Sequence, residues 1–146
     1  MDIIGYSNYL IYQDGKVYSK FTNRFLKQHL NRNGYYSVDL WANKVRKVNR
    51  IHRLVGIHYI PNPDNKLCID HIDRNRQNND ISNLRWATHT ENMNNTGIRC
   101  DNTTGHKNIG YCKSRNKWRY RKGNIGRYFT TLEDAIIFKQ TTTNSL

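Results

Sequence analysis

The sequence predicts an α+β fold in which a central ββα unit is flanked by small antiparallel sheets. Short alternating segments separated by turn signals fill the first third of the chain. Two apolar runs in the middle enclose a polar, Asn-rich loop and lead into a helix start, and aromatic and basic segments near the C-terminus precede another. With 146 residues and a hydrophobic fraction of 36%, we expect two or three small modules rather than one large core.

Residues 1–49 are expected to form an N-terminal antiparallel sheet. Asp14-Gly15 and Asn33-Gly34 are hairpin turn signals, and alternating residues flank each of them. Val45 and Val48 stand among basic residues, which indicates a further strand with a basic face. The other expected strands cover residues 9–12, 17–19, 25–27 and 35–41.

Residues 50–96 are expected to form the central unit. It begins with a helix over residues 50–59, because Ile51, Leu54 and Val55 have helical spacing. Two prolines follow directly, and a helix cannot continue through them.

The rest of the central unit reads as strand, loop, strand and helix. Strands are expected over residues 67–69 and 83–87, with the polar loop between them. Thr88 and Glu91 have the spacing of a capping box, so a helix is expected to start there. Trp86 is expected to lie in the core.

The C-terminal part is expected to hold a linker at residues 97–105, a module at 106–140 and a frayed tail at 141–146. Thr131 and Asp134 have N-cap spacing and predict a helix after the last strand. The strands of this module are expected near residues 109–111, 117–120 and 126–129.

The formal net charge of +13 is unevenly distributed. Residues 16–53 contain ten Lys or Arg and one acid, and residues 107–127 contain eight and no acid. Residues 61–95 carry five acids against four bases. Two basic flanks around a mildly acidic middle indicate a protein that binds a polyanion through both flanks and has carboxylates in the middle that can coordinate a metal.

Other classes of protein fit the sequence less well. No long helix with a basic face and no transmembrane run is found, so no membrane partner is expected. The first fifteen residues lack an apolar stretch of signal-peptide length, so the protein is not expected to be secreted. Cys68, Cys100 and Cys112 are odd in number and form no C-x-x-C pair, which indicates a reducing, intracellular compartment and no structural zinc.

Asp70, His71 and Asn92 are the candidate chemical groups of the central unit. If the first strand ends near Asp70, both Asp70 and His71 can approach one cleft, and Asn92 lies one turn into the following helix. A carboxylate and an amide oxygen suit one Mg²⁺ or Mn²⁺ ion, and His71 suits a general base that activates water beside a phosphodiester.

Three further residues have expected roles around this group. Asn83 is expected to hold the loop through hydrogen bonds to the backbone and to orient His71. Arg85 on the second strand is expected to contact phosphate. His52, on the first helix among apolar residues, is expected to be a packed structural histidine. A plainer interpretation remains open, since an isolated Asp-His pair is more often part of a turn or cap.

Two rows of basic residues are candidate DNA contacts. Alternating cations on a strand place one row of charge on one face, and such strands lie along phosphates or enter a groove. The alternative is a solvated sheet face. The candidates are Lys44, Arg46 and Arg50 in the first part of the chain, and Arg115, Lys117, Arg119 and Arg121 in the last.

Residues 51–95 resemble the HNH domain of intron-associated homing endonucleases from phages and large DNA viruses. The resemblance implies a ββα-metal fold, Asp70 and Asn92 as metal ligands, and His71 as base. In this subfamily the third signature position is often Asn, as at Asn92. Arg74 departs from the pattern, because such domains frequently have Gly there. The residues that carry the resemblance are 52–55, 60–63, 70–73, 78–79, 83–86 and 91–92.

The flanking parts have resemblances of their own. Residues 34–38 and the strands around them are similar to the DNA-binding sheet that precedes the HNH domain in the same enzymes. The C-terminal module resembles an AP2-type DNA-binding module. Because Trp118 and Tyr128 are only ten positions apart, we expect a shortened module with an incomplete third strand.

The sequence as a whole predicts a metal-dependent DNA endonuclease of the HNH homing type. Its expected partner is double-stranded DNA, its expected state is a monomer, and its expected setting is the cytoplasm of a host cell infected by a phage or virus. Two alternatives stay open: a non-catalytic DNA-binding protein with a decayed HNH scaffold, and an RNA-binding or ribosome-associated protein.

Overall fold

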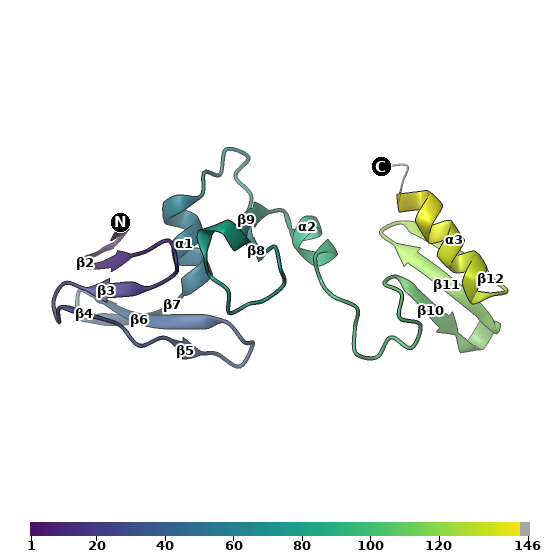
Figure 1. The fold of residues 1–146 in the computed structure, drawn as a ribbon, viewed down its shortest axis with the longest axis horizontal. Helices are drawn as coiled ribbons and strands as arrows, with labels where there is room; N and C mark the ends of the chain where they lie inside the picture. The colour runs from purple at the N-terminus through teal and green to yellow at the C-terminus, as the bar shows by residue number, and fades with distance from the viewer. Residues whose placement is uncertain (144–146) are drawn as a thin grey trace. The chain divides into compact units, whose positions relative to one another are not determined.

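The computed structural model describes residues 1–143 and divides the chain into two compact units. The first unit is Met1–Thr96 and the second begins at Gly97, where the sequence predicted a linker. Figure 1 shows the first unit as sheets around α1 (Ile51–Tyr59) and the second as a sheet with one covering helix. The predicted division at residue 50 is not a boundary between compact units.

The N-terminal strands form two antiparallel sheets rather than the one that we expected. The first has the order β1-β2-β3-β4 and the second β5-β6-β7. β1 and β5 have two residues each, which is too short for an alternating pattern to reveal them. The strands are β1 (Asp2–Ile3), β2 (Tyr6–Ile11), β3 (Val17–Ser19), β4 (Arg24–Phe25), β5 (His29–Leu30), β6 (Tyr36–Ala42) and β7 (Val45–Arg50).

Helix α1 follows β7 directly and ends at the predicted residue. The backbone N–H of Ile60 donates to the carbonyl of Gly56 over 3.1 Å, and Pro61 prevents a further turn. Gly56 faces the side chain of Ile69, which a Cβ at position 56 would overlap. The helix therefore lies close against the first strand of the ββα unit.

The predicted ββα unit is present. β8 (Cys68–His71) pairs with β9 (Leu84–Ala87) in antiparallel register, with Asp70 opposite Arg85. The capping box of helix α2 (His89–Asn94) is confirmed: Glu91 N–H donates to Thr88 Oγ1 over 3.2 Å, and Thr88 N–H to Glu91 Oε2 over 2.6 Å. A short 3-10 turn, η1 (Ile81–Asn83), leads into β9.

The N-terminal sheets and the ββα unit share one hydrophobic core, which explains why residue 50 is no boundary. The inner faces of the sheets pack on α1, whose other contacts reach β8 and β9. Burying both sheets on one helix gives a larger core than residues 1–49 would form alone. The core residues include Ile11, Val17, Val38, Leu40, Ile51, Val55, Ile69 and Leu84.

The second unit is a three-stranded antiparallel sheet of β10 (Ile109–Cys112), β11 (Lys117–Lys122) and β12 (Ile125–Phe129), followed by α3 (Leu132–Thr143). The expectation of an incomplete third strand was wrong. β12 pairs with β11 along its whole length, from Phe129 opposite Trp118 to Ile125 opposite Lys122. Gly123, at φ +56°, makes the turn between them tight enough to leave room for a whole strand.

Helix α3 also extends further than expected. The predicted tail at 141–146 is helical as far as Thr143, and its last three residues lie outside the described part of the chain. Ile109, Tyr120 and Ala135 form the small core between this helix and its sheet. Within residues 1–143, no helix is both long and apolar enough to span a membrane.

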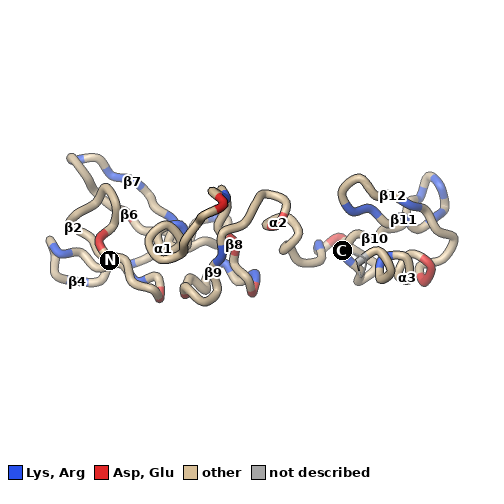
Figure 2. The backbone as a smooth tube through the Cα atoms, turned by 90° about the horizontal axis from the view of Figure 1, so that it is seen from above, with Lys and Arg blue, Asp and Glu red and all other residues tan. Residues whose placement is uncertain are grey.

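Basic residues occur in both units. Figure 2 shows Lys and Arg on β7 in the first unit and on β11 in the second. Acidic residues are fewer, and one of them, Asp70, is buried in the ββα unit.

Candidate active site

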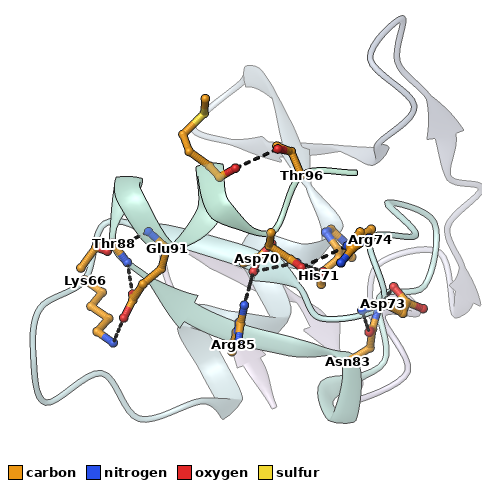
Figure 3. Close-up of polar contacts among 12 residues, drawn as sticks. Lys66, Asp70, His71, Asp73, Arg74, Asn83, Arg85, Thr88, Glu91 and Thr96 are labelled. Atoms are coloured by element: carbon orange, nitrogen blue, oxygen red, sulfur yellow. Dashed lines mark hydrogen bonds and ion pairs between the residues drawn. The ribbon is translucent and has the colours of Figure 1, made fainter. Parts of the chain in front are cut away.

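Asp70, the third residue of β8, is a buried carboxylate held by two partners. Its residue exposure is 6%. Arg85, across the ladder on β9, donates to Asp70 Oδ2 from Nε over 3.1 Å and from Nη2 over 2.9 Å (Figure 3). Asn95 Nδ2 lies 3.0 Å from each carboxylate oxygen. The guanidinium balances the buried negative charge, and the amide adds a hydrogen bond to it.

Asn95, not the predicted Asn92, is the amide that the structure places at Asp70. Asn95 caps the end of α2, and its Nδ2 also donates to the carbonyl of His71 over 2.7 Å. The two asparagines are three positions apart and so neighbours on one helix face, which sequence spacing alone does not separate. The structure records no hydrogen bond from the Asn92 side chain to any residue that it describes.

His71, the last residue of β8, is also buried, at 5% exposure. Its Nε2 lies 3.2 Å from Asn79 Oδ1, and its ring contacts the rings of Tyr35 and His52 at centroid distances of 5.9 and 5.1 Å. Burial lowers the pKa of His71, against the opposing effects of the Asn79 hydrogen bond and of the nearby carboxylates. The imidazole is therefore neutral at neutral pH and able to accept a proton.

Neighbouring residues of β8 point to opposite sides, and the site keeps this alternation. Asp70 contacts Arg85 and Asn95, whereas the His71 side chain contacts Asn79 and the aromatic rings. The strand continues through His71, so the expected strand end at Asp70 is not found. The two groups remain adjacent because they are consecutive in the chain.

His52 is packed, as predicted, but its neighbour is the candidate base. It is 5% exposed, and its ring contacts those of Tyr35 and His71 at centroid distances of 4.9 and 5.1 Å. Burial lowers the pKa of His52 from 6.5 to about 3, with smaller contributions from His71 and the nearby arginines. His52 Nδ1 has no hydrogen-bond partner among the residues described.

Asn83 holds the polar loop, as the sequence predicted. Its Oδ1 accepts from the backbone N–H of Asp73 over 3.0 Å, and its Nδ2 donates to Asp73 Oδ1 and to the carbonyl of Asn78 over 2.9 and 2.8 Å. The side-chain hydrogen bond of His71 is made with Asn79 instead. The role of Asn79 was missed because Asn residues in such loops usually make Asx turns. The one sequence feature that could have indicated it is that residues 78–79 belong to the segment that resembles HNH domains.

Arg74 adopts a left-handed backbone conformation, which glycine adopts more readily than any other residue. Its φ is +65°, in the left-handed region, where a side chain costs roughly 1 kcal/mol or more. Its Nε donates to Asn95 Oδ1 over 3.3 Å, so the residue also contacts the amide beside Asp70. The loop turns at Arg74 by accepting this strain.

The oxygen atoms of the Asp70 carboxylate and the Asn95 amide are of the kind that coordinate a hard divalent ion. Asp70 offers two carboxylate oxygens, and rotating the amide of Asn95 would present its oxygen in place of its nitrogen. Among the described residues, no cluster of three or more His, Cys, Asp or Glu is suited to a metal. A single carboxylate with one amide leaves several positions for water and phosphate, as Mg²⁺ prefers.

The predicted row of basic DNA contacts in the first unit belongs to the β6–β7 hairpin. Lys44 lies in the turn of this hairpin with φ +63°, and Arg46 forms an ion pair with Asp39 at 2.9 Å. The Arg50 guanidinium lies 5.5 Å from the Tyr35 ring centroid. Arg85, predicted to contact phosphate, is paired with Asp70 while its side chain stays 48% exposed.

The predicted DNA contacts of the second unit alternate along β11. Lys117, Arg119 and Arg121 are exposed, and Tyr120 between them is buried. Arg115 is not on the strand as expected but in the short 3-10 turn before it, with its guanidinium 4.8 Å from the Tyr128 ring centroid.

The model of a family described as HNH endonuclease matches residues 49–94 of the chain. An uncharacterized HNH endonuclease of Acanthamoeba polyphaga mimivirus is 48% identical over 87 residues, which cover 60% of this chain and 26% of that protein. DNA endonuclease I-HmuI of Bacillus phage SP01 is 37% identical over 95 residues, covering 64% and 55%. The chain thus matches less than two thirds of the length of either relative.

The fold is similar to that of the HNH homing endonuclease I-HmuI, in a structure described as DNA binding and cleavage by that enzyme. The TM-score is 0.63 at 27% identity, and the match covers 94% of this chain and 81% of the other. The predicted α+β fold with small antiparallel sheets is confirmed. The viral and phage sources of the relatives support the predicted origin.

Proposed function

We propose that the protein is a metal-dependent DNA endonuclease of the homing type that hydrolyses a phosphodiester bond. The observation that carries this proposal is the pair of consecutive buried groups at the end of β8: the Asp70 carboxylate and the neutral imidazole of His71. They lie in the segment that matches HNH endonucleases, and the similar enzyme I-HmuI binds and cleaves DNA.

One Mg²⁺ or Mn²⁺ ion would be held by Asp70 and one carboxamide. Asn95 is supported by its contact with Asp70, and Asn92 by its signature position. The ion, when bound, neutralises charge on the phosphate and on the leaving oxygen. Arg85, half exposed beside Asp70, is positioned to add positive charge at the same place.

His71 acts as the general base in this proposal. Its neutral imidazole takes a proton from a water molecule, whose oxygen bonds to phosphorus as the bond from phosphorus to the 3′ oxygen of the neighbouring nucleotide breaks. The departing 3′ oxygen takes up a proton from solvent water. The products carry 5′-phosphate and 3′-hydroxyl ends. Asn83 contributes indirectly, because its three hydrogen bonds hold the loop next to His71.

Double-stranded DNA is the proposed substrate, gripped by both units of a monomeric protein. In the first unit the proposed contacts are Lys44, Arg46 and Arg50. In the second, an AP2-like module presents Lys117, Arg119 and Arg121 on one face of its sheet, with Arg115 at the edge. One active site per monomer favours a nick in one strand. The setting is the interior of a host cell infected by the source virus.

The test is incubation of the purified protein with supercoiled plasmid, with and without Mg²⁺ or Mn²⁺, followed by mapping of the ends. We expect metal-dependent nicking by the wild type. His71→Ala should lose about 10²- to 10⁴-fold in rate and retain DNA binding. Wild-type turnover by His71→Ala would overturn the mechanism.

A non-catalytic DNA-binding protein is the second candidate. The observation in its favour is that both oxygens of Asp70 already accept hydrogen bonds from side chains. DNA binding without cleavage in Mg²⁺, Mn²⁺ and other divalent ions would establish it.

A further inference from the structure

We propose that Asn79 is the positioning residue that orients His71 and leaves Nδ1 as the ring nitrogen that accepts the proton. This inference rests on the proposed function, because it assigns a role relative to the proposed base. No role for Asn79 follows from the sequence alone, in which it is one of several asparagines of the polar loop.

The contact between the two side chains is buried. Asn79 is 6% exposed and His71 is 5% exposed, and 3.2 Å separate Asn79 Oδ1 from His71 Nε2. In such surroundings an unpaired polar atom costs about 1–3 kcal/mol. Breaking this hydrogen bond would therefore leave two buried polar atoms unpaired and destabilise the fold.

A second hydrogen bond fixes which end of the Asn79 amide faces the ring. Asn79 Nδ2 donates to the carbonyl of Gln77 over 3.1 Å, which directs Oδ1 towards His71. An amide oxygen only accepts, so His71 Nε2 must carry the hydrogen. A neutral imidazole has one N–H, which leaves Nδ1 with a free lone pair.

The other neighbours of His71 do not make this choice. Tyr35 and His52 contact the ring by packing, at centroid distances of 5.9 and 5.1 Å. Packing restricts the plane of the ring but does not distinguish one ring nitrogen from the other. The hydrogen bond of Asn79 does distinguish them.

Asn79 is itself held by the N-terminal sheet. A Cβ at Gly15 would lie 3.1 Å from Asn79 Cβ, so the Gly15 backbone passes directly over this residue at φ +82°. The backbone N–H of Ile81 donates to the carbonyl of Gln13 over 2.9 Å. The turn at residues 13–15 therefore supports the loop that orients the base, which links the N-terminal sheet to the chemistry.

The direct test is the ¹⁵N NMR spectrum of the His71 ring in the full-length protein at pH 7, without DNA or metal. The wild type is expected to show the Nε2–H tautomer. Asn79→Leu is expected to show a mixture of tautomers, whereas Asn79→Asp, which retains an acceptor oxygen, is expected to keep Nε2–H. Asn78→Ala is the matched control, because Asn78 lies in the same loop and bonds to Asp73 instead.

The kinetic test uses the same variants in plasmid nicking. Asn79→Leu should lower kcat about 10- to 100-fold with KM nearly unchanged, by analogy with partners that orient other functional histidines. Asn79→Asp should recover much of that loss. A purely structural role would lower the amount of folded protein without changing the tautomer, and thermal unfolding of each variant separates the two cases.

The inference fails if the wild-type ring is protonated at Nδ1, or if Asn79→Leu keeps the wild-type tautomer and kcat. If Asn79→Leu does not fold, Asn79→Ser, which is smaller and polar, takes its place with the same expected results. The spectrum is independent of cleavage. If the wild type has the expected tautomer but does not nick DNA, the proposed function is wrong and the proposed orientation of His71 is supported.

Discussion

The imidazole rings of His52 and His71 pack edge to face, with centroids 5.1 Å apart and planes at 65°. Both rings are almost fully buried, and burial lowers the pKa of each. Protonating either one would place a cation against a second imidazole in a poorly solvated site. His71 is accordingly among the groups that lower the pKa of His52, whereas the pKa of His71 is lowered chiefly by burial, to which the packed ring of His52 contributes.

The first prediction follows from the pKa of His52, which is lowered to about 3 in the fold. In the unfolded chain this residue binds a proton below about pH 6.5, whereas in the folded chain it binds one only below about pH 3. The contribution of His52 to stability is therefore complete above pH 6.5. It is lost as pH falls towards 3, by up to about 1.4 kcal/mol per pH unit.

Urea unfolding at pH 7, 6 and 5 measures this loss. His52→Phe keeps a packed ring without a titrating group, and its stability should fall less steeply with pH than that of the wild type. The second unit contributes equally to both proteins, so it cancels in the comparison. Equal slopes for the two proteins would show that His52 does not titrate as expected.

The second prediction separates the two candidate amide ligands beside Asp70. Because Asn95 lies 3.0 Å from both carboxylate oxygens, Asn95→Ala should weaken Mn²⁺ binding by about 10-fold or more. Asn92→Ala should change it little. Electron paramagnetic resonance titration of the full-length protein with Mn²⁺ measures both affinities, and Asp70→Ala serves as the control for a lost ligand.

The reverse order of effects would return the ligand role to Asn92. It would also mean that the amide of Asn95 serves Asp70 only in the metal-free protein. Unchanged affinity in both variants would remove the amide from the metal site altogether.

The third prediction concerns the strained backbone at Arg74. With φ at +65°, Arg74→Gly removes the strain and Arg74→Ala retains it, while both lose the hydrogen bond to Asn95. Arg74→Gly should therefore be about 0.5–1 kcal/mol more stable than Arg74→Ala. Denaturant unfolding of the pair provides the measurement, and a more stable Ala variant would contradict the left-handed conformation.

Local signals in the sequence predicted most of the fold. The capping box at Thr88 and Glu91 and the helical spacing after Ile51 were confirmed, because each depends on residues a few positions apart. The shared core and the third strand of the second unit were missed. The core brings together distant segments of the chain, such as those that contain Leu40 and Val55. The third strand depends on how tightly the chain turns at Gly123.

For the candidate site, the sequence allowed candidate residues to be named but not the side chains that they contact. Asp70 and His71 are buried in the predicted unit, and Asn83 holds the loop as expected. The side-chain partners were missed, namely Asn95 at Asp70 and Asn79 at His71. In a segment so rich in asparagine, residue type does not reveal which amide reaches which group.

The fourth prediction compares the two faces of the C-terminal sheet. Arg119 is exposed on β11 between Trp118 and Tyr120, whose side chains point to the opposite face. Arg127 on β12 is paired in register with Tyr120, and its guanidinium lies 5.0 Å from the Phe138 ring on the α3 side. The two arginines thus carry equal charge on opposite faces of one sheet.

If the face of Arg119 contacts phosphates, Arg119→Gln should reduce the slope of log affinity against log salt by about 1, the loss of one phosphate contact. Arg127→Gln, which removes the same charge from the α3 side, should change the slope much less. Fluorescence anisotropy with a labelled DNA duplex at several salt concentrations gives both slopes. Equal changes of slope in the two variants would mean that this unit attracts DNA through its net charge, whichever face of the sheet carries that charge.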